Sequence, residues 1–219
     1  MLAFSSLLGN VEGQNIYRIW YDKPASYWEE ALPVGNGRIA AMVFGDPQLE
    51  QIQLNEETVS AGSPYQNYNE EAKTALPEMR RLIFEGKYEE AQNMAATKIL
   101  SQVGNEMPYQ TVGRLNIRYQ DHKKVNNYYR DLDISNAVAV TRYEVDGVEF
   151  TEETFASFTD QLVIRHIKAS KPGTINCELF FNTPMRDPKR SIYGKKGLRL
   201  EGITHGSRYF PGKVHYCAD

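Results

Sequence analysis

The chain has 219 residues, which is enough for one large domain with a buried core. Its composition, 41% hydrophobic and 24% charged, is that of an ordinary globular protein. The net charge of −3 argues against a nucleic-acid-binding protein, and no apolar run approaches the roughly 20 residues of a membrane helix.

The first 14 residues resemble the remnant of a secretory signal peptide. Leu2–Leu8 reads LAFSSLL, a short apolar stretch, and Val11–Gln14 resembles a cleavage site, although the basic segment that usually comes first is missing. The alternative interpretation is a frayed N-terminus. We expect a protein that is secreted or periplasmic, with residues 1–14 outside the fold and a domain over residues 15–219.

Strands are predicted for the next part of the chain. Asn15–Tyr21 alternates and is rich in β-formers, and Arg38–Phe44 reads as a buried strand that follows a Gly-Asn-Gly turn. Glu50–Leu54 places Ile52 and Leu54 on one face and glutamines on the other, so it is predicted to pair with the preceding strand.

The hydrophobic period then changes from two to 3.6 residues. Tyr68–Phe84 and Tyr88–Leu100 both carry apolar residues at helical spacing, and Gly86 between them is a typical helix stop. This pattern predicts a helical hairpin inserted between about Asn69 and Leu100.

Strand patterns return after Pro108. The strongest hairpin signal is Asp146-Gly147 between two alternating segments. Residues 206–219 show no final strand pair, so we expect the sequence to end inside a domain. The predicted class is mainly β, an antiparallel β-sandwich (supersandwich) with an inserted helical hairpin. The later strands are predicted at Arg114–Tyr119, Val138–Val145, Val148–Phe155, Gln161–Ala169, Thr174–Phe181 and Leu198–Ile203.

The titratable residues form no recognisable catalytic or metal-binding motif. The four histidines lack the spacings of zinc sites. Acidic pairs such as Glu152-Glu153 lie on strands, where neighbouring side chains point to opposite faces, so no pair can flank a glycosidic bond alone. We expect no catalytic residue, metal or cofactor in this chain, and free thiols at Cys177 and Cys217.

An ordered set of motifs resembles the N-terminal region of glycoside hydrolase family 95, the α-L-fucosidase family. Its most distinctive member is WEEALPVGNGR at Trp28–Arg38, and the set covers roughly Ile16 to Asn182. The other members are Met42–Gly45, Gln53–Thr58, Ala61–Pro64, Arg81–Ala91, Tyr109-Gln110, Tyr129–Asp133, Phe155–Ser157 and Asp160-Gln161. The sequence departs from the family pattern at Ser60 and Arg114, where the family usually has Trp and Asp.

The resemblance implies an N-terminal β-supersandwich, a helical linker, a catalytic (α/α)6 barrel and a C-terminal β domain. It implies an inverting exo-glycosidase whose catalytic residues lie in the barrel, so none is carried over to this sequence. The implied partners are the barrel of the same polypeptide and a fucosylated oligosaccharide, with no nucleic acid or membrane. Related members act on L-galactosides, so L-fucose and L-galactose both stay open.

Four residues in turns and connectors are candidates for facing the substrate or the barrel: Trp28, Asn36, Asn55 and Glu56. Polar residues in loops on a rigid scaffold are often placed for recognition or docking. The alternative is turn chemistry, in which Asn and Gly satisfy local backbone geometry. At the level of the whole chain, the alternatives to a glycosidase domain are a carbohydrate-binding module and a purely structural sandwich.

Overall fold

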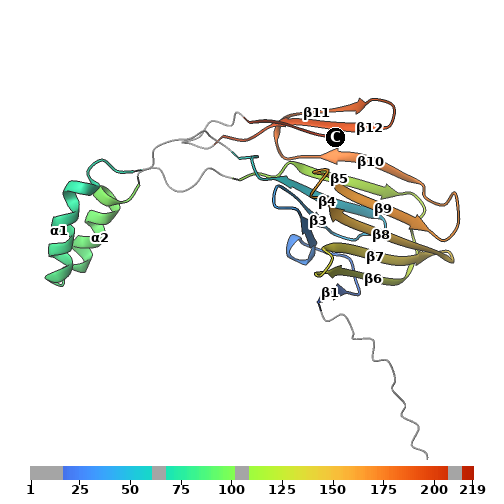
Figure 1. The fold of residues 1–219 in the computed structure, drawn as a ribbon, viewed down its shortest axis with the longest axis horizontal. Coiled ribbons are helices and arrows are strands. Elements are labelled where there is room, and N and C mark those ends of the chain that lie inside the picture. The colour runs from blue at the N-terminus through green and yellow to red at the C-terminus, as the bar shows by residue number, and fades with distance from the viewer. Residues whose placement is uncertain (1–16, 61–67, 102–108, 207–213) are drawn as a thin grey trace, which may run out of the picture. The chain divides into compact units, whose positions relative to one another are not determined.

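The computed structural model describes residues 17–60, 68–101, 109–206 and 214–219 (Figure 1). The predicted signal-peptide remnant, residues 1–14, lies outside the described residues. The chain divides into two compact units. The first comprises Met1–Glu57 and Thr111–Pro184, and the second comprises Thr58–Gln110 and Met185–Asp219.

The first unit is an antiparallel sandwich of two five-stranded sheets, in agreement with the predicted class. One sheet has the order β1-β6-β7-β8-β9 and the other the order β10-β5-β4-β3-β2 (Figure 1). The first contains β1 (Arg18–Tyr21), β6 (Val125–Asp133), β7 (Val138–Val145), β8 (Val148–Ala156) and β9 (Val163–Ala169). The second contains β2 (Leu32–Gly35), β3 (Ile39–Val43), β4 (Leu49–Glu56), β5 (Gly113–Tyr119) and β10 (Cys177–Asn182).

The core of this unit lies between the two sheets. Alternation along each strand sends every second side chain inward, so that Ile52 and Ile117 of one sheet join Leu132 and Ala139 of the other in a single buried cluster. The predicted division of β4 into an apolar and an amide face is confirmed, since Ile52 is buried and its neighbours Gln51 and Gln53 are half-exposed.

Two segments near the predicted strands differ from expectation. Strand β2 was not predicted; the chain forms a single 3-10 turn, Trp28–Glu30, and then enters this strand directly. Strand β6 was not predicted, because its register shifts between Asn126 and Tyr129 and the bulge hides the alternation on which strand patterns depend. The Asp146-Gly147 turn between β7 and β8 is confirmed, with positive φ angles of 49° and 76° at its two residues.

The second unit contains the predicted helical hairpin. Helix α1 (Ala72–Phe84) is followed by α2 (Tyr88–Met94) and a π-helical turn at Ala95–Ile99. Gly86 ends α1 with a φ of 75°, and the amide of Lys87 then donates to the carbonyl of Leu82 at 2.9 Å. Within the described residues, no helix is both long enough and apolar enough to cross a membrane.

The second unit also contains a three-stranded antiparallel sheet, β11-β12-β13. Its strands are β11 (Arg186–Tyr193), β12 (Gly197–Ile203) and β13 (His215–Ala218). The expectation that residues 206–219 lack a final strand pair is wrong, because β13 pairs with β12 from His215 to Ala218. Four residues of mixed polarity are too short a run for periodicity to reveal.

Candidate functional site

Asn36 holds the turn between β2 and β3 against the loop after β8. Its side-chain oxygen accepts hydrogen bonds from the amides of Arg38 and Ile39 at 3.0 and 2.9 Å. Its side-chain nitrogen donates to the carbonyl of Ser157 at 2.8 Å. The two bonds of the Asn36 side-chain oxygen are therefore ordinary turn contacts. The bond of its nitrogen to Ser157, 121 positions away, is a tertiary contact that holds two loops together.

The predicted residues Asn55 and Glu56 lie beside this turn, whereas Trp28 does not. Asn55 pairs with Ala40 across β3 and β4, and Glu56 accepts from the guanidinium of Arg38 at 3.0 Å. Trp28 precedes β2 and Asn36 follows it, so the strand separates them. The structure thus brings three of the four candidates to one end of β3 and β4.

Trp28 belongs to a loop whose backbone is hydrogen-bonded by Arg130. The Arg130 guanidinium donates to the carbonyls of Lys23 and Glu30 at 2.8 and 2.6 Å and lies 4.0 Å from the ring centre of Tyr21. The Trp28 side chain itself is 48% exposed. A large aromatic on a fixed loop is suited to contact with another surface.

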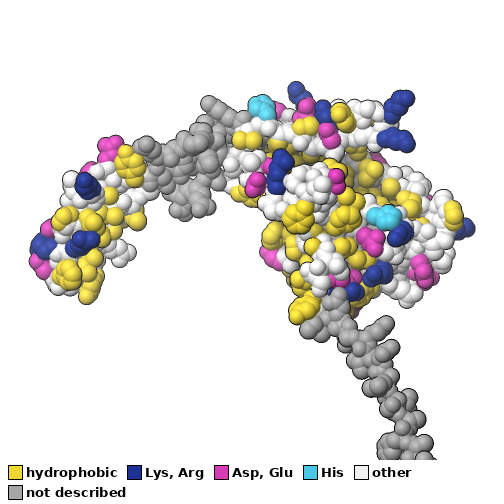
Figure 2. All heavy atoms as spheres, viewed as in Figure 1, with side chains coloured by type: hydrophobic (Ala, Val, Ile, Leu, Met, Phe, Trp, Pro, Cys, Tyr) yellow, Lys and Arg dark blue, Asp and Glu magenta, His cyan; other side chains and the backbone are white. Residues whose placement is uncertain are grey.

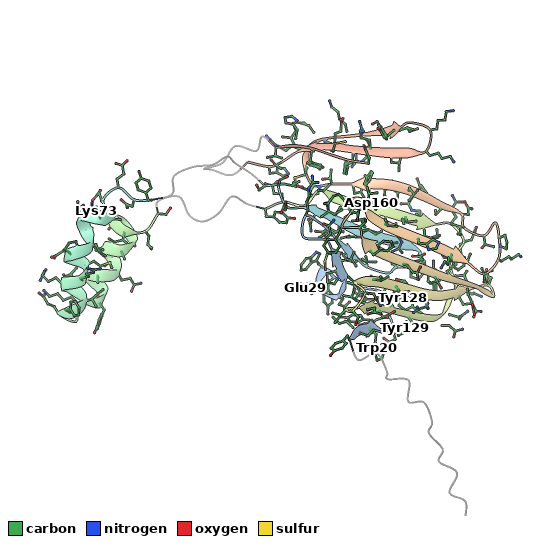
Figure 3. All side chains as sticks on the ribbon, in the orientation of Figure 1. Trp20, Glu29, Lys73, Tyr128, Tyr129 and Asp160 are labelled. Carbon is green, nitrogen blue, oxygen red and sulfur yellow. The ribbon has the colours of Figure 1, made fainter. Side chains whose placement is uncertain are left out.

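A stacked pair of aromatic side chains lies at the edge of the other sheet. Trp20 on β1 stacks on Tyr129 of β6, with ring centres 6.2 Å apart and planes at 18° (Figure 3). Trp20 is 61% exposed, although its neighbours on the same face include the ion pair of Arg18 and Asp131 at 2.9 Å. This pair is a second aromatic surface of the first unit.

Two buried carboxylates lie inside the sandwich, where the sequence predicted none. Arg165 on β9 donates to Glu50 of β4 at 2.7 Å and also to Glu152 of β8, and both glutamate side chains are almost fully buried. The hydroxyls of Tyr119 and Tyr143 each donate to Glu152 at 2.7 Å. The cluster therefore ties the two sheets together through hydrogen-bonded charges.

Burial sets the protonation of this cluster. The pKa of Glu50 is raised to about 7, chiefly by its removal from water. The charge of Arg165 opposes this shift, and the charge of Glu152 contributes to it. Glu50 therefore keeps its proton up to a higher pH than an exposed glutamate does. A substrate cannot reach either glutamate, since both lie under the sheets, and the pair does not qualify as the acid and base of a glycosidase.

A concavity of the first unit lies on the outer face of β10, β5 and β4. Its volume is about 560 Å³. The strand register sets its side chains in rows, with Gln53, Arg114 and Asn182 in one row and Gln51, Asn116 and Phe180 in the next. We call this surface the amide groove. The alternation of β4 was a signal for its glutamines, but the register that brings three strands together is not visible in the sequence.

No group of three or more His, Cys, Asp or Glu in the described part of the chain is arranged to hold a metal ion. Cys177 and Cys217 are free thiols.

Comparison with known proteins gives one family match and several relatives. The family model described as "Glycosyl hydrolase family 65, N-terminal domain" matches residues 19–216. A protein of Arabidopsis thaliana named "Alpha-L-fucosidase 2" is 37% identical over 181 residues, which are 80% of this chain and 21% of that protein. Two proteins named "Probable alpha-fucosidase A" are 26% identical in Aspergillus niger, over 69% of this chain and 20% of theirs, and 25% identical in Aspergillus oryzae, over 90% and 28%. The chain spans between 20% and 28% of the length of these relatives.

Proposed function

Because the chain belongs to the family of glycosyl hydrolase N-terminal domains whose relatives are named α-fucosidases, we propose that it is the N-terminal β-sandwich of an inverting exo-α-L-fucosidase and is not catalytic by itself. The observation that supports this most is the family match over residues 19–216. The buried position of Glu50 and Glu152 agrees with it, since these carboxylates cannot flank a sugar.

In this proposal, the fixed loops of the sandwich face a catalytic (α/α)6 barrel of the same polypeptide. Asn36 and Glu56 are held by contacts that reach across loops and strands, and Trp28 offers an aromatic surface on a loop anchored by Arg130. The substrate is a fucosylated oligosaccharide, and L-galactosides are the competing class.

We also propose that the protein acts outside the cytoplasm, and that N-terminal sequencing of the native protein should give a start near Gln14. A native protein that retains Leu2–Leu8 would contradict this.

The test is a chimera in which residues 19–216 replace the matching segment of the Arabidopsis relative. The isolated 219-residue chain should release no sugar from 2'-fucosyllactose or from nitrophenyl α-L-fucoside, whereas the chimera should hydrolyse both. Nitrophenyl α-L-galactoside distinguishes the two sugars, and nitrophenyl β-D-galactoside is the negative control. Hydrolysis of the fucosides by the isolated chain, or a folded chimera that hydrolyses no α-L-glycoside, would contradict the proposal.

A further inference from the structure

We propose that the amide groove on the outer face of β10, β5 and β4 is a saccharide-binding site for acidic oligosaccharides, those that carry a carboxylate. This site goes beyond the proposed role in a fucosidase and does not rest on it. The groove lies wholly within the first unit, and its volume of about 560 Å³ is in the range of small-ligand sites.

The first reason is the hydrogen-bonding character of the groove. The amides of Gln51, Gln53 and Asn182 present both donors and acceptors along adjacent strands. Sugar hydroxyls also donate and accept, so a surface of amides suits them, whereas a surface made only of donors suits a simple anion. The half-buried ring of Phe180 lies in the same lining and supplies an apolar surface for the C–H face of a sugar ring.

The second reason is the rigidity of the groove floor. Asn116 is only 4% exposed, and its side-chain nitrogen donates to the carbonyls of Arg114 and Phe180 at 3.2 and 3.3 Å. The bond to Phe180 joins β5 to β10 at the floor of the groove. A site built on three paired strands is held in place before a ligand arrives, which lowers the entropy cost of binding.

The third reason is charge. Among the described residues that line the groove there are two arginines and no acidic residue, although the chain as a whole carries a net charge of −3. Arg118 is compensated by Glu178, at 2.7 Å, and lies 4.8 Å from the ring centre of Phe180. Arg114 instead donates to a neutral group, the side-chain oxygen of Gln51, at 2.7 Å.

Arg114 is therefore the group that selects an acidic ligand. Its guanidinium lies 5.6 Å from the ring centre of the buried Phe44, which fixes its position, and among the described residues no carboxylate forms an ion pair with it. A guanidinium has five N–H donors, so most are available after the bond to Gln51. A carboxylate on a sugar ring can accept two of them in the forked geometry that guanidinium groups favour.

The experiment measures the affinity of the 219-residue chain for three probes by titration calorimetry. Tetragalacturonate is acidic and carries sugar hydroxyls, maltotetraose is a neutral saccharide, and tetraglutamate is acidic without sugar hydroxyls. Tetragalacturonate should bind about tenfold or more tightly than either of the others, since a forked guanidinium–carboxylate contact has about that effect. Equal affinity for maltotetraose would overturn the acidic class, and equal affinity for tetraglutamate would overturn the saccharide class.

Variants locate the site. Arg114→Gln should weaken tetragalacturonate binding about tenfold or more, whereas Lys168→Gln removes an exposed charge from the other sheet and should have no effect. Trp20→Ala removes the competing aromatic surface and should also have no effect. Unchanged binding in Arg114→Gln, or its loss in Trp20→Ala, would overturn the assignment.

The wild-type chain gives a test that needs no variant to fold. Tetragalacturonate should shift the NMR signals of amide groups on β4, β5 and β10, including those of Gln53, Arg114 and Asn182. Shifts confined to other strands, or no shifts at a saturating concentration, would overturn the proposal.

Discussion

Arg165 donates to Glu50 and Glu152 in the interior of the sandwich, where 7% of its side chain is exposed. Removing this guanidinium leaves two carboxylates in a low-dielectric region without a cation. The Arg165→Met variant should therefore lower the free energy of unfolding by about 3–5 kcal/mol at pH 8. Urea unfolding followed by tryptophan fluorescence measures this change.

The control for Arg165 lies three residues along the same strand. Lys168 is exposed, and its 3.8 Å pair with Glu153 is a surface ion pair, so Lys168→Met should change the free energy of unfolding by about 0.5 kcal/mol or less. Similar losses in both variants would show that the buried cluster does not have the stabilising role we assign to it.

Glu50 makes the stability of the sandwich depend on pH. Its pKa in the folded protein, about 7, lies above the ordinary value of 4.5, so the folded state binds the proton more tightly than the unfolded state. The stabilising contribution of this proton is complete below about pH 4.5 and is lost as the pH rises through about 7. From pH 5 to pH 8, the wild type should therefore lose about 1–3 kcal/mol relative to Glu50→Gln, which has no titrating group there.

The measurement is a series of urea unfolding curves for both proteins between pH 5 and pH 8. The absolute stability of Glu50→Gln is expected to be lower, because an amide replaces an acceptor that binds Phe44, Gly45 and Arg165, so only the slope with pH is compared. Glu149→Gln on β8 changes an exposed carboxylate and should keep the wild-type slope. A parallel pH dependence in Glu50→Gln and wild type would contradict the assignment.

The burial of Glu50 is predictable from the sequence pattern, whereas its pairing with Arg165 is not. Alternation places Glu50 on the same face of β4 as Ile52 and Leu54, so its burial follows from the pattern. Its partner Arg165 is 115 positions away and lies in the other sheet. Periodicity assigns faces within one strand but does not say which strands face each other, so the pairing was not predictable.

Among the elements, the helical hairpin was predicted from its period, whereas β2, β6, β11 and β13 were not. The hairpin has a sustained apolar stripe over two helices and a glycine between them. Strand β11, by contrast, reads RDPKRSIY, is exposed along its whole length and contains a proline. A strand that buries no face has no alternation to detect, and its pairing with β12 is decided by the backbone.

Asn69 connects the start of α1 to the end of the helical hairpin through its side-chain hydrogen bonds. Its side-chain nitrogen donates to the carbonyls of Thr97 and Leu100 at 3.2 and 3.4 Å, and its side-chain oxygen accepts from the amide of Glu71 at 3.0 Å. The residue is 8% exposed. Asn69→Ala should destabilise the hairpin by about 1–2 kcal/mol, because carbonyls at a helix end and an amide near a helix start both lose their partner.

Hydrogen exchange is the measurement suited to this change, because it separates the hairpin from the sandwich. The amides of α1 and α2 should exchange about five- to thirtyfold faster in Asn69→Ala, while those of β4 and β5 keep their rates. The control is Asn93→Ala, which replaces an exposed asparagine inside α2 with a better helix former and should not speed exchange. Unchanged exchange in Asn69→Ala would mean that helix packing alone holds the hairpin.

At the scale of the whole chain, large apolar side chains are exposed in both parts of the second unit, the helical hairpin and the three-stranded sheet. In the hairpin, Phe84 is 89% and Tyr88 69% exposed, and Figure 2 shows hydrophobic side chains gathered on its surface. In the three-stranded sheet, Ile192 of β11 is 78% exposed. The composition, with 41% hydrophobic residues, gives no sign of this, since it counts residues and does not say which of them are covered.

Strand β11 combines this apolar exposure with an edge position. It is the outer strand of its sheet, so one side of its backbone has no strand partner among the described residues. An edge strand with exposed apolar side chains favours pairing with another chain. We expect the 219-residue chain to associate at about 100 µM, a protein concentration at which exposed apolar surfaces and strand edges commonly cause association.

A lysine on this edge should reduce the association, since an inserted charge is a common means of protecting edge strands. Ile192→Lys is therefore expected to shift the chain toward the monomer in analytical ultracentrifugation. Ile134→Lys is the matched control, because it makes the same change at a 53% exposed isoleucine between β6 and β7. If both variants associate as the wild type does, the contact lies elsewhere, and the exposed Phe84 of α1 becomes the next position to change. A wild-type chain that stays monomeric at about 100 µM would contradict the prediction itself. Such a result would show that the edge is already protected by the charges of β11, which include Arg186, Lys189 and Arg190.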